Sequence, residues 1–108
     1  MAPTQLEKRL ELQEILEGCM PVDEKNVYFQ PKASFQMEYP CIVYQRDYAV
    51  TRHADNQPYT SVQRYQVTAI DKDPDSEIHA NVGRLSLSLF QRHYVSANLN
   101  HDVYSVYF

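Results

Sequence analysis

Three alternating aspartates are the side chains that most suggest chemistry in this chain of 108 residues. Asp71, Asp73 and Asp75 have the spacing of the first ligands of a calcium loop, and carboxylate oxygens are the hard donors that Ca²⁺ prefers. Such a loop needs glycine at its sixth position and a bidentate glutamate at its twelfth, where this chain has serine and valine. The alternation instead predicts a helix start, with Asp73 as N-cap and Pro74 as the first helical residue.

The histidines raise the question of a metal centre. Zinc sites are built from Cys and His ligands at short, fixed spacings. No two histidines of this chain have such a spacing, and neither cysteine belongs to a paired motif, so we predict no metal site and expect solvated or hydrogen-bonded side chains. The four histidines are His53, His79, His93 and His101.

The two cysteines, Cys19 and Cys41, are expected to be reduced and buried, because nothing in the sequence indicates secretion. Cys41 opens the apolar run Cys41–Tyr44, where a thiol has a raised pKa and acts as a small core residue. With only two glycines, the chain also lacks a glycine-rich phosphate loop. We therefore predict no catalytic residue and no cofactor, and keep as an alternative a small enzyme that uses Cys41 or a histidine-carboxylate pair.

Two polar segments near the C-terminus bracket one turn and concentrate directional hydrogen-bonding groups. One interpretation is a contact surface, and the other is a well-capped turn whose Asn and Asp side chains bond to the local backbone. Composition does not separate the two. Tyr28 and Phe29, in a short β-prone segment that ends at Pro31, are further candidate contacts. The candidate contacts of the two polar segments are Arg92, His93, Tyr94, Asn98, Asn100, His101 and Asp102.

The composition is that of a folded protein, with 44% hydrophobic and 22% charged residues. Nine tyrosines and four phenylalanines provide rings suited to sheets and interfaces. A formal charge of −4 without a basic cluster disfavours binding to a phosphate backbone. No apolar run is long enough to span a membrane, so we expect a protein made in the cytosol.

The helices and strands that position these residues can be predicted from helix-capping residues and from the spacing of apolar residues. Thr4 and Glu7 form a capping-box pattern, which predicts a helix that buries Leu12, Ile15, Leu16 and Cys19 and ends at Gly18. A short edge strand is expected over 26–30. A hairpin follows, with strands over 41–51 and 59–70 and a turn over 54–58.

A second helix is predicted to end at Gly83, and Leu85, Leu87 and Leu89 alternate with serines as in a half-buried strand toward Tyr94. A polar turn over 98–102 and a last strand to Phe108 complete the chain. We predict a single α+β domain over 1–108, in the order α-β-β-β-α-β-β. It would have a mainly antiparallel sheet of about five strands and two helices packed on one face. Segment 26–30 and the last strand are the expected sheet edges.

Several segments in this order together resemble a family of small tail-completion, or head-tail joining, proteins of long-tailed phages. The resemblance spans most of the chain from about Asn26 onward, while the first helix carries no family signature. The segments are Tyr39–Tyr44, Ala54–Asn56, Tyr65–Thr68, Asp73–Ser76, Arg92–Tyr94 and Leu99–Asp102.

The resemblance implies a structural subunit of the virion that forms a ring, expected to be a homohexamer, at the head-proximal end of the tail tube. Such a ring would stop tube growth and would join the tube to the connector or stopper proteins of the head. Genomic DNA would pass through its lumen without specific binding, and a net acidic subunit suits such a channel. The alternative virion role is a head-completion or neck protein on the portal side.

Overall fold

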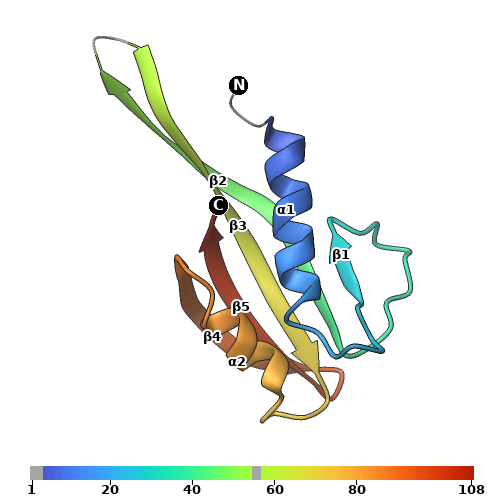
Figure 1. The fold of residues 1–108 in the computed structure, drawn as a ribbon. Coiled ribbons are helices and arrows are strands. Elements are labelled where there is room, and N and C mark those ends of the chain that lie inside the picture. Colours follow the sequence, from blue (N-terminus) through green and yellow to red (C-terminus); the bar gives the residue numbers. More distant parts are fainter. Residues whose placement is uncertain (1–3, 55–56) are drawn as a thin grey trace.

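The computed structural model describes residues 4–54 and 57–108, and the side chains of residues 4–47 and 63–108 within them. The chain has the α+β fold expected from its sequence, and its described residues form two helices and five strands in the predicted order (Figure 1). The elements are α1 (Gln5–Glu17), β1 (Val27–Phe29), β2 (Cys41–Ala54), β3 (Gln57–Asp71), α2 (Glu77–Gly83), β4 (Ser88–Ser96) and β5 (Leu99–Tyr107).

The strands form one sheet in the order β1-β2-β3-β5-β4. β1 pairs with β2 in parallel, with Val27 opposite Ile42, whereas the other three pairings are antiparallel. The short strand expected over 26–30 is therefore an edge, as predicted. The expectation that the last strand is also an edge is wrong, because β5 lies between β3 and β4 and leaves β4 as the second edge.

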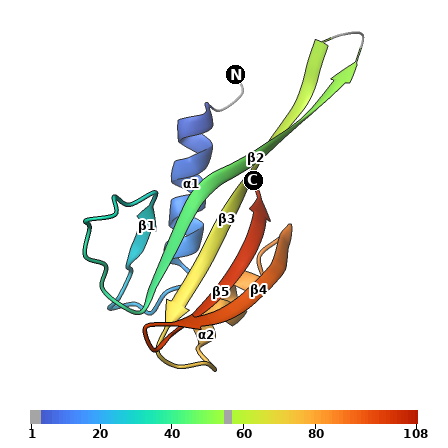
Figure 2. The same cartoon turned by 180° about the vertical axis from the view of Figure 1, so that it is seen from behind.

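Both helices pack on one face of the sheet, as Figures 1 and 2 show from opposite sides. The main core lies beneath them and takes alternate residues of the strands, since side chains of a strand point to opposite faces in turn. Tyr44, Tyr65 and Val67 are fully buried there. A smaller cluster of Cys41, Ile70 and Leu99 lies on the other face, which we call the open face.

Helix α1 begins as the sequence predicts. The Glu7 backbone N–H donates to Thr4 Oγ1 at 3.1 Å, and Gly18 is the C-cap. Leu12 and Leu16 are buried under the helix. Ile15, expected in the same stripe, is 39% exposed because it lies at the rim of the contact with the sheet.

Helix α2 starts later than predicted. Its N-cap is Ser76, whose Oγ accepts from the Ile78 backbone N–H at 3.2 Å, and Asp73 is not the cap. Asp73 Oδ1 instead accepts from the Asp75 backbone N–H at 2.9 Å, so this aspartate closes a local turn before the helix. Ile78 and Val82 are buried, and Gly83 is the last helical residue, as expected.

The β2–β3 hairpin projects beyond the rest of the sheet (Figures 1 and 2). Its strands pair as far as Ala54 with Gln57, whereas the pairing of β3 with β5 stops at Arg64 with Tyr107. The outer part of the hairpin is therefore a two-stranded arm, in a molecule 51 Å long and 26 Å wide. The turn predicted over 54–58 includes Asp55 and Asn56, which lie outside the described residues.

The region after α2 corrects two further predictions. The strand expected from Leu85 begins only at Ser88, because Leu87 has a φ of 59° and breaks the extended backbone. The polar turn expected over 98–102 is a two-residue turn formed by Ala97 and Asn98, with φ of 53° and 63°. Positive φ at both positions is typical of the type I′ hairpin turn, which matches the twist of the flanking strands.

Candidate assembly surface

The β4–β5 hairpin brings the two predicted polar segments side by side. His93 lies opposite Asp102, and Tyr94 lies opposite His101. The two segments therefore form cross-strand pairs along the hairpin and do not merely flank its turn. Since paired residues of an antiparallel ladder share a face, the pairs divide between the helix-covered face and the open face.

On the open face, aromatic and basic side chains of β4 and β5 form a stack. The rings of Tyr94 and His101 lie 4.6 Å apart and are almost parallel, at 9°. The Arg92 guanidinium lies 5.5 Å from the centre of the Tyr94 ring, within range of a cation–π contact. The arrangement orders three side chains at the surface of an edge strand, where Tyr94 is still 40% exposed.

On the helix-covered face, His93 Nδ1 lies 2.8 Å from Asp102 Oδ1. The Asp102 side chain is only 12% exposed, while that of His93 is 40% exposed, so the histidine screens the carboxylate from solvent. This pair stabilises the cross-strand register and leaves one edge of the imidazole accessible.

The two asparagines near the turn have different environments. Asn98 occupies the turn and is exposed. Asn100 Nδ2 donates to the backbone carbonyls of Asp71 and Lys72, at 3.3 and 3.1 Å. Asn100 therefore ties β5 to the end of β3 and the connection to α2, so its hydrogen bonds are long-range and differ from those of a side chain bonded to the local backbone of its turn.

Tyr28 and Phe29 lie at the opposite edge of the sheet, on β1 (Figure 1). Tyr28 packs edge-on against Phe35, with ring centres 5.0 Å apart, and its hydroxyl accepts from the Glu38 backbone N–H at 3.2 Å. Phe29 packs against Tyr44 and beneath the Arg9 guanidinium, which lies 4.4 Å from its ring centre. The predicted contact residues thus belong to two separate edges.

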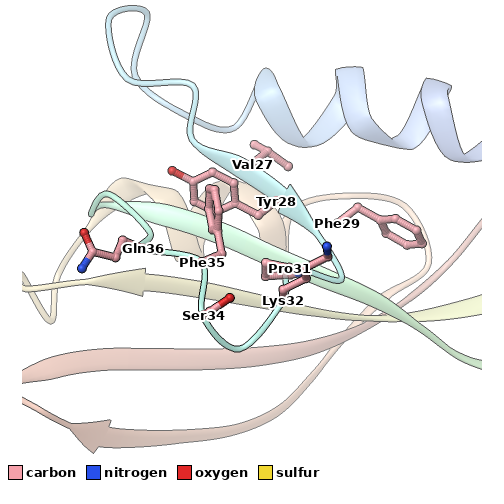
Figure 3. A pocket seen from close by; sticks show the side chains of 8 residues that line it. All are labelled: Val27, Tyr28, Phe29, Pro31, Lys32, Ser34, Phe35 and Gln36. Atoms are coloured by element: carbon pink, nitrogen blue, oxygen red, sulfur yellow. The ribbon is translucent and has the colours of Figure 1, made fainter.

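A groove of about 580 Å³ runs between β1 and the loop that follows it (Figure 3). Most of its lining is aromatic or aliphatic, and Lys32, Ser34 and Gln36 add polar groups at its rim. Its lining residues are Val27, Tyr28, Phe29, Pro31, Lys32, Ser34, Phe35 and Gln36.

The structure adds apolar residues of β4 that the sequence did not identify as contacts. Leu89 and Phe90 are each 57% exposed, Val95 is 62% exposed, and Leu87 just before the strand is 67% exposed. The leucine alternation predicted a half-buried strand, but β4 has a partner strand on one side only, and α2, although it contacts β4, leaves these side chains exposed. The missing signal was the position of β4 in the sheet, which depends on the pairing of distant strands.

The cysteines have the properties of core residues. Both are free and buried, as expected. Burial, with a smaller contribution from the Asp71 carboxylate, raises the pKa of the Cys41 thiol to about 12. Burial also raises the pKa of Cys19. A thiol with a raised pKa is almost wholly protonated at neutral pH and is a poor nucleophile.

Within the described residues, no three His, Cys, Asp or Glu side chains lie close enough together to hold a metal ion. No helix in that part of the chain is both long and apolar enough to cross a membrane.

No protein-family model matches the chain. A search of curated proteins likewise finds no match. The resemblance to phage tail-completion proteins therefore stays a prediction from the sequence.

Proposed function

We propose that this chain is a structural subunit of a long-tailed phage, which forms a ring at the head-proximal end of the tail tube and joins the tube to the head connector. The phage role follows from the sequence resemblance. The structural observation that supports an assembly subunit is strand β4, a sheet edge of nine residues that is exposed along almost its whole length.

Edge strands of stable monomers are usually protected, because their unpaired N–H and C=O groups can pair with another chain. Common protections are charged residues, above all lysine, or proline on the edge, short strands, bulges and a covering helix or loop. β4 has neither lysine nor proline, and its protections are the single charged residue Arg92 and one bulge between Phe90 and Arg92. Exposed apolar residues flank that bulge. These properties suit a strand that another protein surface covers after assembly.

The β2–β3 arm supports the second part of the proposal, contact with other components. A two-stranded ribbon is marginally stable alone in water. An arm that extends past β1 and β5 is suited to packing against a neighbouring subunit, the tail tube protein or the head connector. The net charge of −4 suits a ring through which DNA must pass without being held.

The test is genetic and uses the intact virion. An amber mutation of this gene should leave filled heads and separate tails that do not join, with tails of abnormal length. Purified protein added to such tails should cap one end, seen by electron microscopy. Tails of normal length, together with protein that binds filled heads only, would indicate the portal-side role. Normal, joined particles would contradict any role at the junction.

A matched pair of variants tests whether β4 is the working surface. Leu89→Lys places a charge on the exposed edge strand, whereas Val22→Lys places it in the loop between α1 and β1, at a residue that is 86% exposed. We expect both proteins to fold, and only Leu89→Lys to fail to complement the amber mutant. Equal complementation by the two variants would exclude β4 as an assembly contact.

A further inference from the structure

The two free edges of the sheet differ in a way that specifies how one copy meets the next. We propose that copies associate head to tail, with the Phe90–Val95 part of β4 of one copy lying along β1 and its groove on the next copy. This inference rests on the proposed function, which requires self-association, and adds which surface meets which.

Val27 and Phe29 are the residues of β1 whose backbone groups point away from β2. The Val27 N–H donates to the Lys25 carbonyl and the Val27 carbonyl accepts from Gln13 Nε2, so Phe29 is the residue that can pair with another strand. The Asn26 carbonyl accepts from the Ile42 N–H, and the Gln30 N–H donates to the Tyr44 carbonyl, both at 2.9 Å. Since successive residues of a strand point their backbone groups to opposite sides, Phe29 presents its N–H and C=O away from β2. Phe29 therefore offers a donor and an acceptor to an incoming strand.

The hydrogen bonds at the two ends of the β4–β5 pairing determine which residues of β4 point their backbone N–H and C=O groups away from β5. The Leu87 carbonyl accepts from the Tyr107 N–H at 3.1 Å, and the two-residue turn requires Ser96 and Leu99 to be a hydrogen-bonded pair. Along β4, successive residues direct their backbone N–H and C=O groups alternately toward β5 and away from it. Counting from the Leu87 end and from the Ser96 end gives the same assignment when the extra residue of the bulge is included. This assignment leaves Phe90 and His93 pointing their backbone groups outward, with Ser88 and Val95 doing the same near the strand ends.

Strand direction makes the two edges compatible. β1 is parallel to β2, and the three antiparallel pairings that follow leave β4 running opposite to β1. Copies related by a rotation about an axis along the strands would thus pair β4 with β1 in antiparallel fashion. Their helices would lie on the same side of the continued sheet. Such a heterologous contact can close into a ring, as an isologous one cannot.

Exposed apolar groups lie at both edges. On α1, Leu6 and Leu10 share a side of the helix with Gln13, whose Nε2 donates to the Val27 carbonyl of β1 at 3.3 Å. Leu6 is 57% and Leu10 is 48% exposed. They lie about two helical turns and about one helical turn before Gln13 on that side of α1, and in the proposed contact they would face the exposed Phe90 of a neighbouring β4.

Charge favours this contact over a β4–β4 dimer. Residues 4–40, which include α1, β1 and the groove, carry seven acidic and four basic side chains. Residues 78–101, which include β4, carry Arg84 and Arg92 and no acidic residue. A β4–β4 pairing would bring two copies of Arg92 together. A β4–β1 pairing instead places Arg92 against a part of the subunit that is net acidic, although the charged residue that lines the groove itself is Lys32.

Cross-linking of the full chain distinguishes the two arrangements. Ser34→Cys lies in the β1 groove and Gln91→Cys lies on β4, both exposed, while Cys19 and Cys41 are buried. With a short bis-maleimide at high protein concentration, a mixture of the two single variants should form dimers, and neither variant alone should. Dimers from Gln91→Cys alone, or no dimers from the mixture, would overturn the proposal. Val22→Cys, in the loop between α1 and β1 at a residue that is 86% exposed, is the control for random collision.

A second pair of variants tests backbone pairing directly. His93→Pro and His93→Thr both remove the contact with Asp102, but only proline removes the outward N–H. Sedimentation should show that the threonine protein still associates and that the proline protein is monomeric. Association by the proline variant would overturn strand pairing. If cross-links form but the protein does not cap tails, the β4–β1 interface is supported and the phage role fails. If the protein caps tails but no cross-links form, the phage role is supported and the β4–β1 interface fails.

Discussion

Strands β4 and β5 form one hairpin and have nine residues each, yet they lie in opposite environments. In β5, six of the nine residues are buried, whereas none is buried in β4. β5 has a strand on either side, while β4 has a partner strand on one side only, and α2 contacts both. The difference separates two roles within a single hairpin, because β5 stabilises the fold and β4 is available for contact with another chain.

The largest expected effect comes from comparing the tyrosines of the two strands. Tyr104 on β5 is 5% exposed and its hydroxyl donates to the His79 carbonyl at 2.9 Å, so Tyr104→Ala should lower the free energy of unfolding by about 3–5 kcal/mol. Tyr94→Ala on β4 should cost about 1 kcal/mol or less, since the side chain is 40% exposed. Urea denaturation of both variants measures this. Equal losses would show that β4 also stabilises the monomer.

The fold was predictable where local signals agree with tertiary packing. The Thr4–Glu7 cap, the end of α1 at Gly18 and the burial of Leu12, Leu16 and Cys19 follow from spacing alone. Each of these features depends on neighbours within a few residues. The α+β class followed from the order of such elements.

The predictions were wrong where a local sequence pattern is compatible with two different structures. Asp73 and Ser76 are both good N-caps, and the aspartate is used in a turn before the helix. The alternation from Leu85 to Leu89 fits a half-buried strand, but long-range pairing places β4 at the edge of the sheet, where its side chains stay exposed.

The same limitation applied to the candidate contacts. Sequence reasoning found the residues that pair across the β4–β5 hairpin, but it did not show that Tyr28 and Phe29 lie at the opposite edge. Nor did it identify Phe90 and Val95. Which edge a strand occupies is a property of the whole sheet, and β5 inserts between β3 and β4 after a helical connection.

A second comparison uses valines, so that the change in volume is the same on both strands. Val106 on β5 is 1% exposed and Val95 on β4 is 62% exposed. Val106→Ala should lower the free energy of unfolding by about 2 kcal/mol, through lost burial and the cavity that remains. Val95→Ala should change it by less than about 0.5 kcal/mol. Thermal unfolding at a concentration where the protein is monomeric measures the difference, and a loss at Val95 as large as at Val106 would remove the distinction between the strands.

The smallest expected effect is a gain in stability at the turn that holds β4 against β5. Ala97 has a φ of 53°, where a Cβ costs about 1–2 kcal/mol, and glycine removes that strain. The greater conformational freedom of glycine in the unfolded chain offsets about 0.5–1 kcal/mol of the free energy gained by removing the strain. Ala97→Gly should therefore raise the free energy of unfolding by up to about 1 kcal/mol.

The same substitution in a helix provides the control for the turn. Ala80→Gly, in α2, relieves no strain and should lower the free energy of unfolding by about 0.5–1 kcal/mol. Urea denaturation of the two variants should thus give shifts of opposite sign. If both variants are destabilised, the turn does not hold Ala97 in a left-handed conformation in solution. In that case the register that directs the Phe90 and His93 backbone groups outward would also lose its support.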